Sequence, residues 1–283
     1  MSPVQILAAL ASAALHAGWN AAVKASPSPT RTMTAQMVGS ALIVLPGLAL
    51  TGLPAKPAWV WIAGSTALNL VTVTALLRAY ALAGFGVVYP LVRALSVLLV
   101  VPLAAAAAGE SLSAFGLIGV GLVAAALLLI AIDRRERDAI PRKAFGWTLA
   151  AGVATAAYVM CDAQGVRLAG SPLSYGFAVS ITNAAAMLWK QSYGPSSDRK
   201  GVSPIAVHYV AAVLPIAAAA VISYLLILWV WSAAPIAPAS ALRDTSAVFA
   251  ILIAVAWLKE PFTRTRLLAI LMSAAAVPLL RLA

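Results

Sequence analysis

The chain has 283 residues, of which 63% are hydrophobic and only 10% are charged. A soluble domain carries about 25% charged residues, so this composition excludes an ordinary soluble protein. The net charge of +11 would suit nucleic-acid binding, but the charges lie in short connectors between apolar runs, as the cytoplasmic loops of membrane proteins require. We therefore expect a membrane protein that contacts a lipid bilayer and no nucleic acid.

Apolar runs of about 20 residues, the length that crosses a bilayer, recur along the whole chain. The helices predicted in the first half cover 4–24, 32–52, 57–82, 86–108 and 112–132. Those predicted in the second half cover 144–168, 173–192, 205–232, 236–258 and 264–282. The most charged stretch of the chain, 133–143, lies between these two sets and indicates a linker.

The two halves carry matching polar residues. The matches at an offset of 150 residues are Arg93 with Arg243, Ser96 with Ser246 and Glu110 with Glu260. The matches at an offset of 143 residues are Lys24 with Arg167 and Ser28-Pro29 with Ser171-Pro172. Five helices per half is an odd number, so the halves must cross the membrane in opposite senses. We predict an all-α integral membrane fold of ten transmembrane helices in two inverted five-helix repeats, 1–133 and 144–283, joined by a charged linker at 134–143.

The loop charges predict an orientation. With ten spans, the odd-numbered connectors hold 13 Lys and Arg residues, whereas the face that carries the termini holds three, Lys56, Arg167 and Arg281. Because cytoplasmic loops are enriched in Lys and Arg, we expect the termini to lie outside the cytoplasm.

Polar residues inside the spans are the candidates for function, because hydrocarbon offers them no hydrogen bonds. Residues spaced three and four apart share a helix face. The sets aligned in this way are His16, Trp19 and Asn20 on the first helix, Thr155, Tyr158 and Asp162 on the sixth, and Ser65, Asn69, Thr72 and Tyr80 on the third. The seventh helix adds Ser180 and Asn183. Each set either lines a cavity or hydrogen-bonds across a helix interface. Asp162 is favoured for a cavity, because a lone buried carboxylate needs water, a cation or a substrate.

The fourth and ninth helices carry the arginines. Tyr89, Arg93 and Ser96 align on the fourth helix. Arg93 suits bidentate binding of a substrate carboxylate, and its alternative role is snorkelling toward the lipid headgroups. Arg243 and Asp244 on the ninth helix are expected to form an ion pair or polar cap rather than a ligand site.

Several residues near the ends of spans are expected to be structural. Glu110 and Glu260 follow the fourth and ninth helices, where a carboxylate favours the start of the next helix. Trp229 and Trp231 lie near the end of a span and are expected to be interfacial anchors.

The chain contains no Walker A, His-Glu-x-x-His or Gly-x-Ser-x-Gly sequence. Its single cysteine, Cys161, excludes an internal disulfide, and two histidines, His16 and His208, are too few and too isolated for a metal centre. We expect no enzyme activity, no catalytic residue, no metal and no cofactor.

Four short motifs resemble one family. They are Leu-His-Ala-Gly-Trp-Asn at 15–20, Tyr-Pro-Leu-Val-Arg-Ala-Leu-Ser at 89–96, Gly-Glu at 109–110 and Lys-Glu-Pro at 259–261. Together with the spans and the repeat, the whole chain resembles the EamA-domain branch of the drug/metabolite transporter superfamily. The resemblance implies a carrier in the bacterial inner membrane with a central cavity built by helices 1, 3, 4, 6, 8 and 9; bacterial members often export amino acids and related metabolites. The first helix lacks the glutamate of the small multidrug branch, which argues against proton-coupled export of lipophilic cations.

The leading hypothesis is therefore a secondary transporter that exports amino acids or similar small zwitterions by alternating access. The predicted cavity residues are His16, Trp19, Asn20, Asn69, Tyr80, Tyr89, Arg93, Ser96, Tyr158, Asp162 and Ser246. Arg93 or Asn20 would hold the carboxylate, Asp162 or free backbone carbonyls the ammonium group, and Trp19, Tyr89 and Tyr158 the apolar part. The alternatives are an exporter of drugs or nucleosides and a membrane enzyme or subunit. The sequence leaves open the exact substrate, export against import, proton coupling, and whether the protein is a monomer or a homodimer.

Overall fold

The computed structural model describes residues 1–83, 85–131, 141–193, 210, 212–256 and 263–283, and every regular element among them is helical. The first half contains α1 (Pro3–Ala25), α2 (Pro29–Thr51), the short 3-10 helix η1 (Lys56–Ala58), α3 (Trp59–Tyr80), α4 (Phe85–Ala108) and α5 (Ala114–Ala131). The second half contains α6 (Arg142–Leu168), α7 (Pro172–Tyr193), α10 (Leu214–Ala233), α11 (Ile236–Asp244), α12 (Ser246–Ala256) and α13 (Arg264–Arg281).

Seven stretches are long and apolar enough to cross a membrane by length and composition. They are Pro3–Val23, Pro29–Thr51, Lys56–Tyr80, Val88–Ala108, Arg142–Leu168, Leu214–Ala233 and Ile236–Ile253. The prediction of an all-α membrane protein is therefore confirmed. The start of the helix predicted at 205–232 lies outside the described residues, as do His208 and Glu260, and the described helix begins at Leu214.

The helix predicted at 236–258 breaks at Thr245 into α11 and α12. The Thr245 hydroxyl donates to the Leu242 carbonyl oxygen at 2.6 Å, and the Thr245 N–H bonds to the same carbonyl in a 3-10 arrangement. The hydroxyl competes with the helical hydrogen bonds at this point. Arg243 and Asp244 consequently lie at the end of α11, deep inside the molecule.

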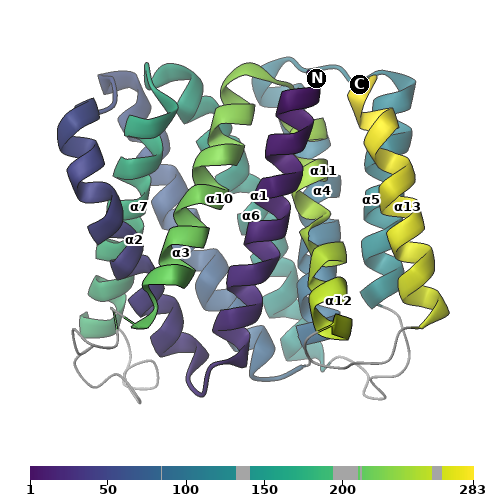
Figure 1. Ribbon diagram of the computed structural model, residues 1–283, viewed down its shortest axis with the longest axis horizontal. Helices are drawn as coiled ribbons and strands as arrows, with labels where there is room; N and C mark the ends of the chain where they lie inside the picture. Colours follow the sequence, from purple (N-terminus) through teal and green to yellow (C-terminus); the bar gives the residue numbers. More distant parts are fainter. Residues whose placement is uncertain (84, 132–140, 194–209, 211, 257–262) are drawn as a thin grey trace.

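The helices run side by side, with both chain ends at the same edge (Figure 1). The pair α2 and α7 lies at one end of the molecule, and the pair α5 and α13 lies at the other. Between these pairs, α6 packs on α3 and α4, and α1 packs on α10, α11 and α12. The central helices therefore form the interior in which a site can be buried.

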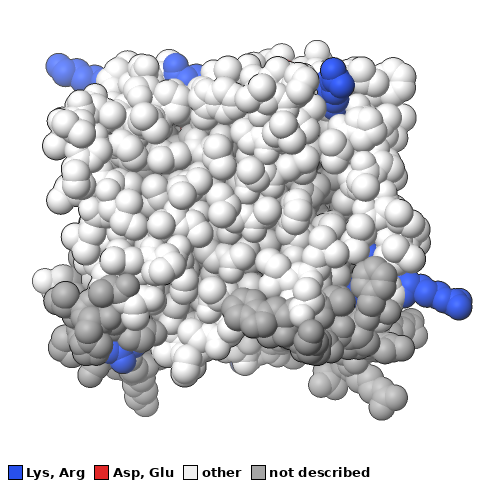
Figure 2. Space-filling view, in the orientation of Figure 1, with Lys and Arg blue, Asp and Glu red and all other residues white. Residues whose placement is uncertain are grey.

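The outer surface carries large apolar side chains, such as Leu50 and Val60, which are 89% and 71% exposed. In Figure 2 the described Lys and Arg side chains appear near the two edges of the molecule, and the band between them is uncharged. An apolar band between charged edges is the surface that a lipid bilayer requires.

Polar contacts close the edge where the termini lie. Arg167, at the end of α6, donates to Glu110 at 3.0 Å and to the carbonyl oxygens of Trp231 and Ala234 at 3.0 and 2.9 Å. The other carboxylate oxygen of Glu110 accepts the Ile236 N–H at the start of α11, at 2.7 Å. Glu110 therefore serves a helix start, but it is that of α11, whereas the sequence predicted that of α5, the next helix along the chain. These contacts join the ends of α4, α6, α10 and α11.

Candidate functional site

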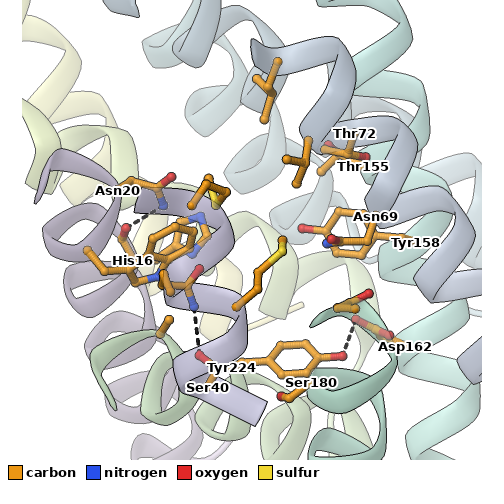
Figure 3. A pocket seen from close by; sticks show the side chains of 18 of the residues that line it. His16, Asn20, Ser40, Asn69, Thr72, Thr155, Tyr158, Asp162, Ser180 and Tyr224 are labelled. Atoms are coloured by element: carbon orange, nitrogen blue, oxygen red, sulfur yellow. Dashed lines mark hydrogen bonds between the residues drawn. The ribbon is translucent and has the colours of Figure 1, made fainter. Parts of the chain in front are cut away.

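A cavity lies among the central helices and contains about 1040 Å³ of empty space, counting the open part at its mouth (Figure 3). The polar and aromatic lining consists of His16, Trp19, Asn20, Gln36, Ser40, Ser65, Asn69, Thr72, Tyr89, Arg93, Thr155, Tyr158, Asp162, Ser180, Asn183, Tyr224 and Arg243. The apolar lining includes Met33, Met37, Val73, Leu76, Val92 and Val221.

Most of the predicted cavity residues line this space. Those that do are His16, Trp19, Asn20, Asn69, Tyr89, Arg93, Tyr158 and Asp162. The structure does not bring Tyr80, Ser96 or Ser246 to the lining. Tyr80 packs against the hydrophobic core, Ser96 is buried between helices, and the Ser246 hydroxyl shares a hydrogen bond of 3.2 Å with the Tyr89 hydroxyl.

Arg93 forms a buried ion pair with Asp244. Its Nη1 donates to the carboxylate at 3.1 Å, its Nη2 contacts His16 Nε2, and its guanidinium lies 5.1 Å from the centre of the Tyr89 ring. The predicted ion pair between Arg243 and Asp244 is therefore wrong, because Asp244 pairs with Arg93. Adjacent helical residues do not face each other, so the carboxylate of Asp244 points away from Arg243 and toward α4.

Arg243 lines the cavity, and two of its guanidinium nitrogens lack hydrogen-bond partners among the described residues. The residue is 5% exposed, and its Nε and Nη1 atoms find no hydrogen-bond partner in the part of the chain that the structure describes. Its guanidinium lies 5.4 Å from the centre of the Trp231 ring. A buried cation without partners is costly, and a guanidinium fork matches a carboxylate. The arrangement can therefore receive an anionic group.

The indole ring of Trp231 lies against the guanidinium of Arg243. This side chain is fully buried, and its Nε1–H donates to the Ser240 hydroxyl at 3.2 Å. Its predicted role as an interfacial anchor is therefore wrong. The reason is that α11 folds back over the end of α10 and covers the ring, whereas Trp229 on the outer face stays 42% exposed.

Asp162 is buried and held by hydroxyl groups from three other helices. Its carboxylate accepts hydrogen bonds from Tyr224 at 2.8 Å (Figure 3) and from Tyr175 at 3.1 Å. Ser65 lies within hydrogen-bonding reach. Sequence reasoning missed both tyrosines. Both tyrosines follow a serine, as Ser174-Tyr175 and Ser223-Tyr224, but only the second pair lies in the middle of an otherwise apolar helix, so its signal is the stronger one.

Gly165 allows the Tyr175 ring to lie against α6. A Cβ atom at this position would lie 2.4 Å from Tyr175 Cε2 and 2.5 Å from its hydroxyl oxygen. We expect Gly165→Ala to displace Tyr175 and to lower the free energy of unfolding by about 1–3 kcal/mol, measured by denaturation in detergent. The matched control is Gly146→Ala on the same helix, where a Cβ meets nothing within 4 Å. Equal stability of the two variants would contradict this prediction.

Residues 142–282, which make up the second half of the chain, match the EamA-like transporter family. The chain belongs to this family. EamA family membership and the apolar helices establish a multi-pass membrane protein, and a transporter family implies a small-molecule substrate. These proteins act as carriers, which gives a catalytic function no support.

The comparison with solved structures supports the fold. A structure described only as the crystal structure of a protein has 16% sequence identity to this chain and a TM-score of 0.73. The match covers 98% of this chain and 95% of the other. At this identity the likeness shows a shared fold and nothing about the substrate. No curated protein matches the chain.

Proposed function

We propose that this protein is a secondary transporter that exports amino acids or similar small zwitterions across the bacterial inner membrane. The observation that carries the proposal is the unsatisfied guanidinium of Arg243 in a cavity that also contains the carboxylate of Asp162. Arg243 and Asp162 line the same cavity, and the described residues show no ion pair between them. A guanidinium and a carboxylate that line one cavity without pairing suit a ligand that carries both a negative and a positive charge.

In this proposal Arg243 takes the place that the sequence assigned to Arg93. Arg243 binds the substrate carboxylate, Asp162 binds the ammonium group, and Trp19 and Tyr158 contact the apolar part. Arg93 is already neutralised by Asp244, so it offers less attraction to an anion. The remaining lining is rich in Asn, Ser and Thr, which provide hydrogen bonds without further charge.

The helix packing supports the proposed inverted repeat. Exchanging the halves pairs α1 with α6, α2 with α7, α3 with α10, α4 with α11 and α12, and α5 with α13. Under this exchange the contact of α3 with α6 becomes that of α10 with α1, and the contact of α2 with α10 becomes that of α7 with α3. The pairs α2–α7 and α5–α13 map onto themselves. We infer ten spans, in which α5, α7 and α13 join the seven stretches identified by hydropathy, and two repeats at 1–133 and 144–283.

The position of the cavity supports alternating access. Its lining includes Asn20 near the end of α1 and Met33 near the start of α2, so it extends toward the edge opposite the termini. The Glu110–Arg167 contacts join helices at the terminal edge. With the termini outside the cytoplasm, as the loop charges predict, the cavity takes its substrate from the cytoplasm, which is the direction of export.

Counterflow in proteoliposomes tests this function. We expect preloaded vesicles with the wild-type protein to accumulate at least one labelled amino acid from a panel of the common twenty. Methyl esters and N-acetyl derivatives of that amino acid should compete about tenfold less well or worse, because each lacks one charge and loses roughly 1.4 kcal/mol of binding. Absence of amino-acid counterflow by folded wild-type protein would contradict the proposal.

An exporter of drugs is the second candidate. Met33 and Met37 together with Trp19 give part of the lining an adaptable apolar character, which suits varied hydrophobic ligands. A resistance screen in an overexpressing strain distinguishes this candidate, because a drug exporter protects the cell whereas an amino-acid exporter does not.

A further inference from the structure

Asp162 differs from the other acidic residues that the structure describes. Glu110 and Asp244 each form an ion pair with an arginine, at 3.0 and 3.1 Å. Asp162 instead accepts hydrogen bonds from hydroxyl groups, although it is only 1% exposed. A carboxyl group that no cation fixes in the ionised form can exchange a proton, and unpaired acidic residues within membrane spans commonly serve such relays.

The hydroxyl groups around Asp162 fit both of its protonation states. When the carboxyl group is ionised, Tyr175 and Tyr224 donate to it, at 3.1 and 2.8 Å. The Tyr175 hydroxyl also lies 3.3 Å from the Cys161 carbonyl oxygen, which is a second acceptor for the same proton. When Asp162 is protonated, Tyr175 can turn its O–H toward Cys161 and accept the new O–H of the acid. No hydrogen bond is lost in either state.

The polar, titratable and charged groups near Asp162 come from five helices. They are Ser65 from α3, Cys161 from α6 itself, Tyr175 from α7, Tyr224 from α10 and Arg243 from α11. Arg243 is the charged group among them. Because the proposed function assigns Arg243 to the substrate carboxylate, the proton and the substrate ammonium group are the two cations left to compete for Asp162.

We propose that Asp162 binds a proton and the substrate ammonium group in turn, so that each zwitterion leaving the cytoplasm is exchanged for one proton. The proposal rests on the proposed function of the same cavity. Substrate arriving from the cytoplasm displaces the proton from Asp162 to that side, and after the substrate leaves on the other side the carboxylate takes up a proton there. A zwitterion has no net charge, so each cycle moves one positive charge inward and responds to both the pH gradient and the membrane potential.

The test measures the proton and substrate fluxes together. Proteoliposomes that contain a pH-sensitive dye receive the amino acid that gives the fastest counterflow, and the ratio of the two fluxes is determined with and without a pH gradient. We expect a ratio of about one proton per substrate for the wild-type protein. Asp162→Asn should transport slowly with a ratio near zero, and Asp162→Glu should restore the ratio toward the wild-type value.

Two further variants separate coupling from a general loss of activity. Asn69→Ala changes a neutral lining residue, so it should lower the rate but keep the wild-type ratio. Tyr175→Phe removes the hydroxyl that hydrogen-bonds to Asp162 in both of its protonation states. It should therefore slow transport driven by a pH gradient more than it slows counterflow. Counterflow by wild-type protein with no proton movement would overturn this inference alone, whereas loss of all amino-acid counterflow would overturn the proposed function itself.

Discussion

Replacing Arg243 with alanine should lower the counterflow rate at low substrate concentration by about 30- to 150-fold. Arg243 lines the cavity, and its Nε and Nη1 atoms have no hydrogen-bond partner among the described residues. Hydrogen bonds from a charged donor to a carboxylate contribute about 2–3 kcal/mol. Initial rates of counterflow below the KM of the wild-type protein measure this loss. The variant should also stop distinguishing the free amino acid from its methyl ester, because it lacks the group that is proposed to bind the carboxylate.

Arg243→Lys and Arg281→Ala are the controls. Lysine keeps the charge but loses the planar fork, so Arg243→Lys should fall between the wild type and Arg243→Ala. Arg281 lies exposed in the last turn of α13, far from the cavity lining, and its replacement should leave transport unchanged. Wild-type selectivity against the methyl ester in Arg243→Ala would show that another group binds the carboxylate.

The helices and much of the cavity follow from local patterns in the sequence. Spacings of three and four residues placed His16, Trp19 and Asn20 on one face of α1, and all three line the cavity. The same spacing placed Tyr158 and Asp162 together on α6. These predictions succeed because helix periodicity alone determines which residues share a face.

The partners of the charged residues did not follow from the sequence, because they depend on contacts between distant segments. Arg93 and Asp244 are 151 residues apart, and only the packing of α4 against α11 brings them together. The break at Thr245 also has no counterpart in α4, which continues without a break from Phe85 to Ala108. Residues that match in the sequence therefore acquire different surroundings in the structure.

That difference gives the two matched arginines separate roles. The position that corresponds to Asp244 in the first half is Ala94, so the two matched segments contain two arginines but one carboxylate. Asp244 binds Arg93, so Arg243 keeps Nε and Nη1 atoms without a partner among the described residues and is the arginine proposed to bind the substrate carboxylate. Because Asp244 neutralises Arg93, Arg243 is the stronger anion receptor of the two. One free arginine is what a site that binds one carboxylate requires.

Replacing Arg93 with methionine should lower the free energy of unfolding by about 3–5 kcal/mol, because it leaves the carboxylate of Asp244 buried without its main partner. The double variant Arg93→Met/Asp244→Leu removes both charges and should recover most of this loss, since replacing a buried pair with apolar groups is often neutral. Denaturation in detergent measures both values. Asp244 is next to Arg243 in the chain, so a small loss of stability together with loss of transport would show that Asp244 had turned to Arg243 and blocked it. A single variant as stable as the wild type, with transport intact, would contradict the assignment of Arg93 and Asp244 as a structural pair.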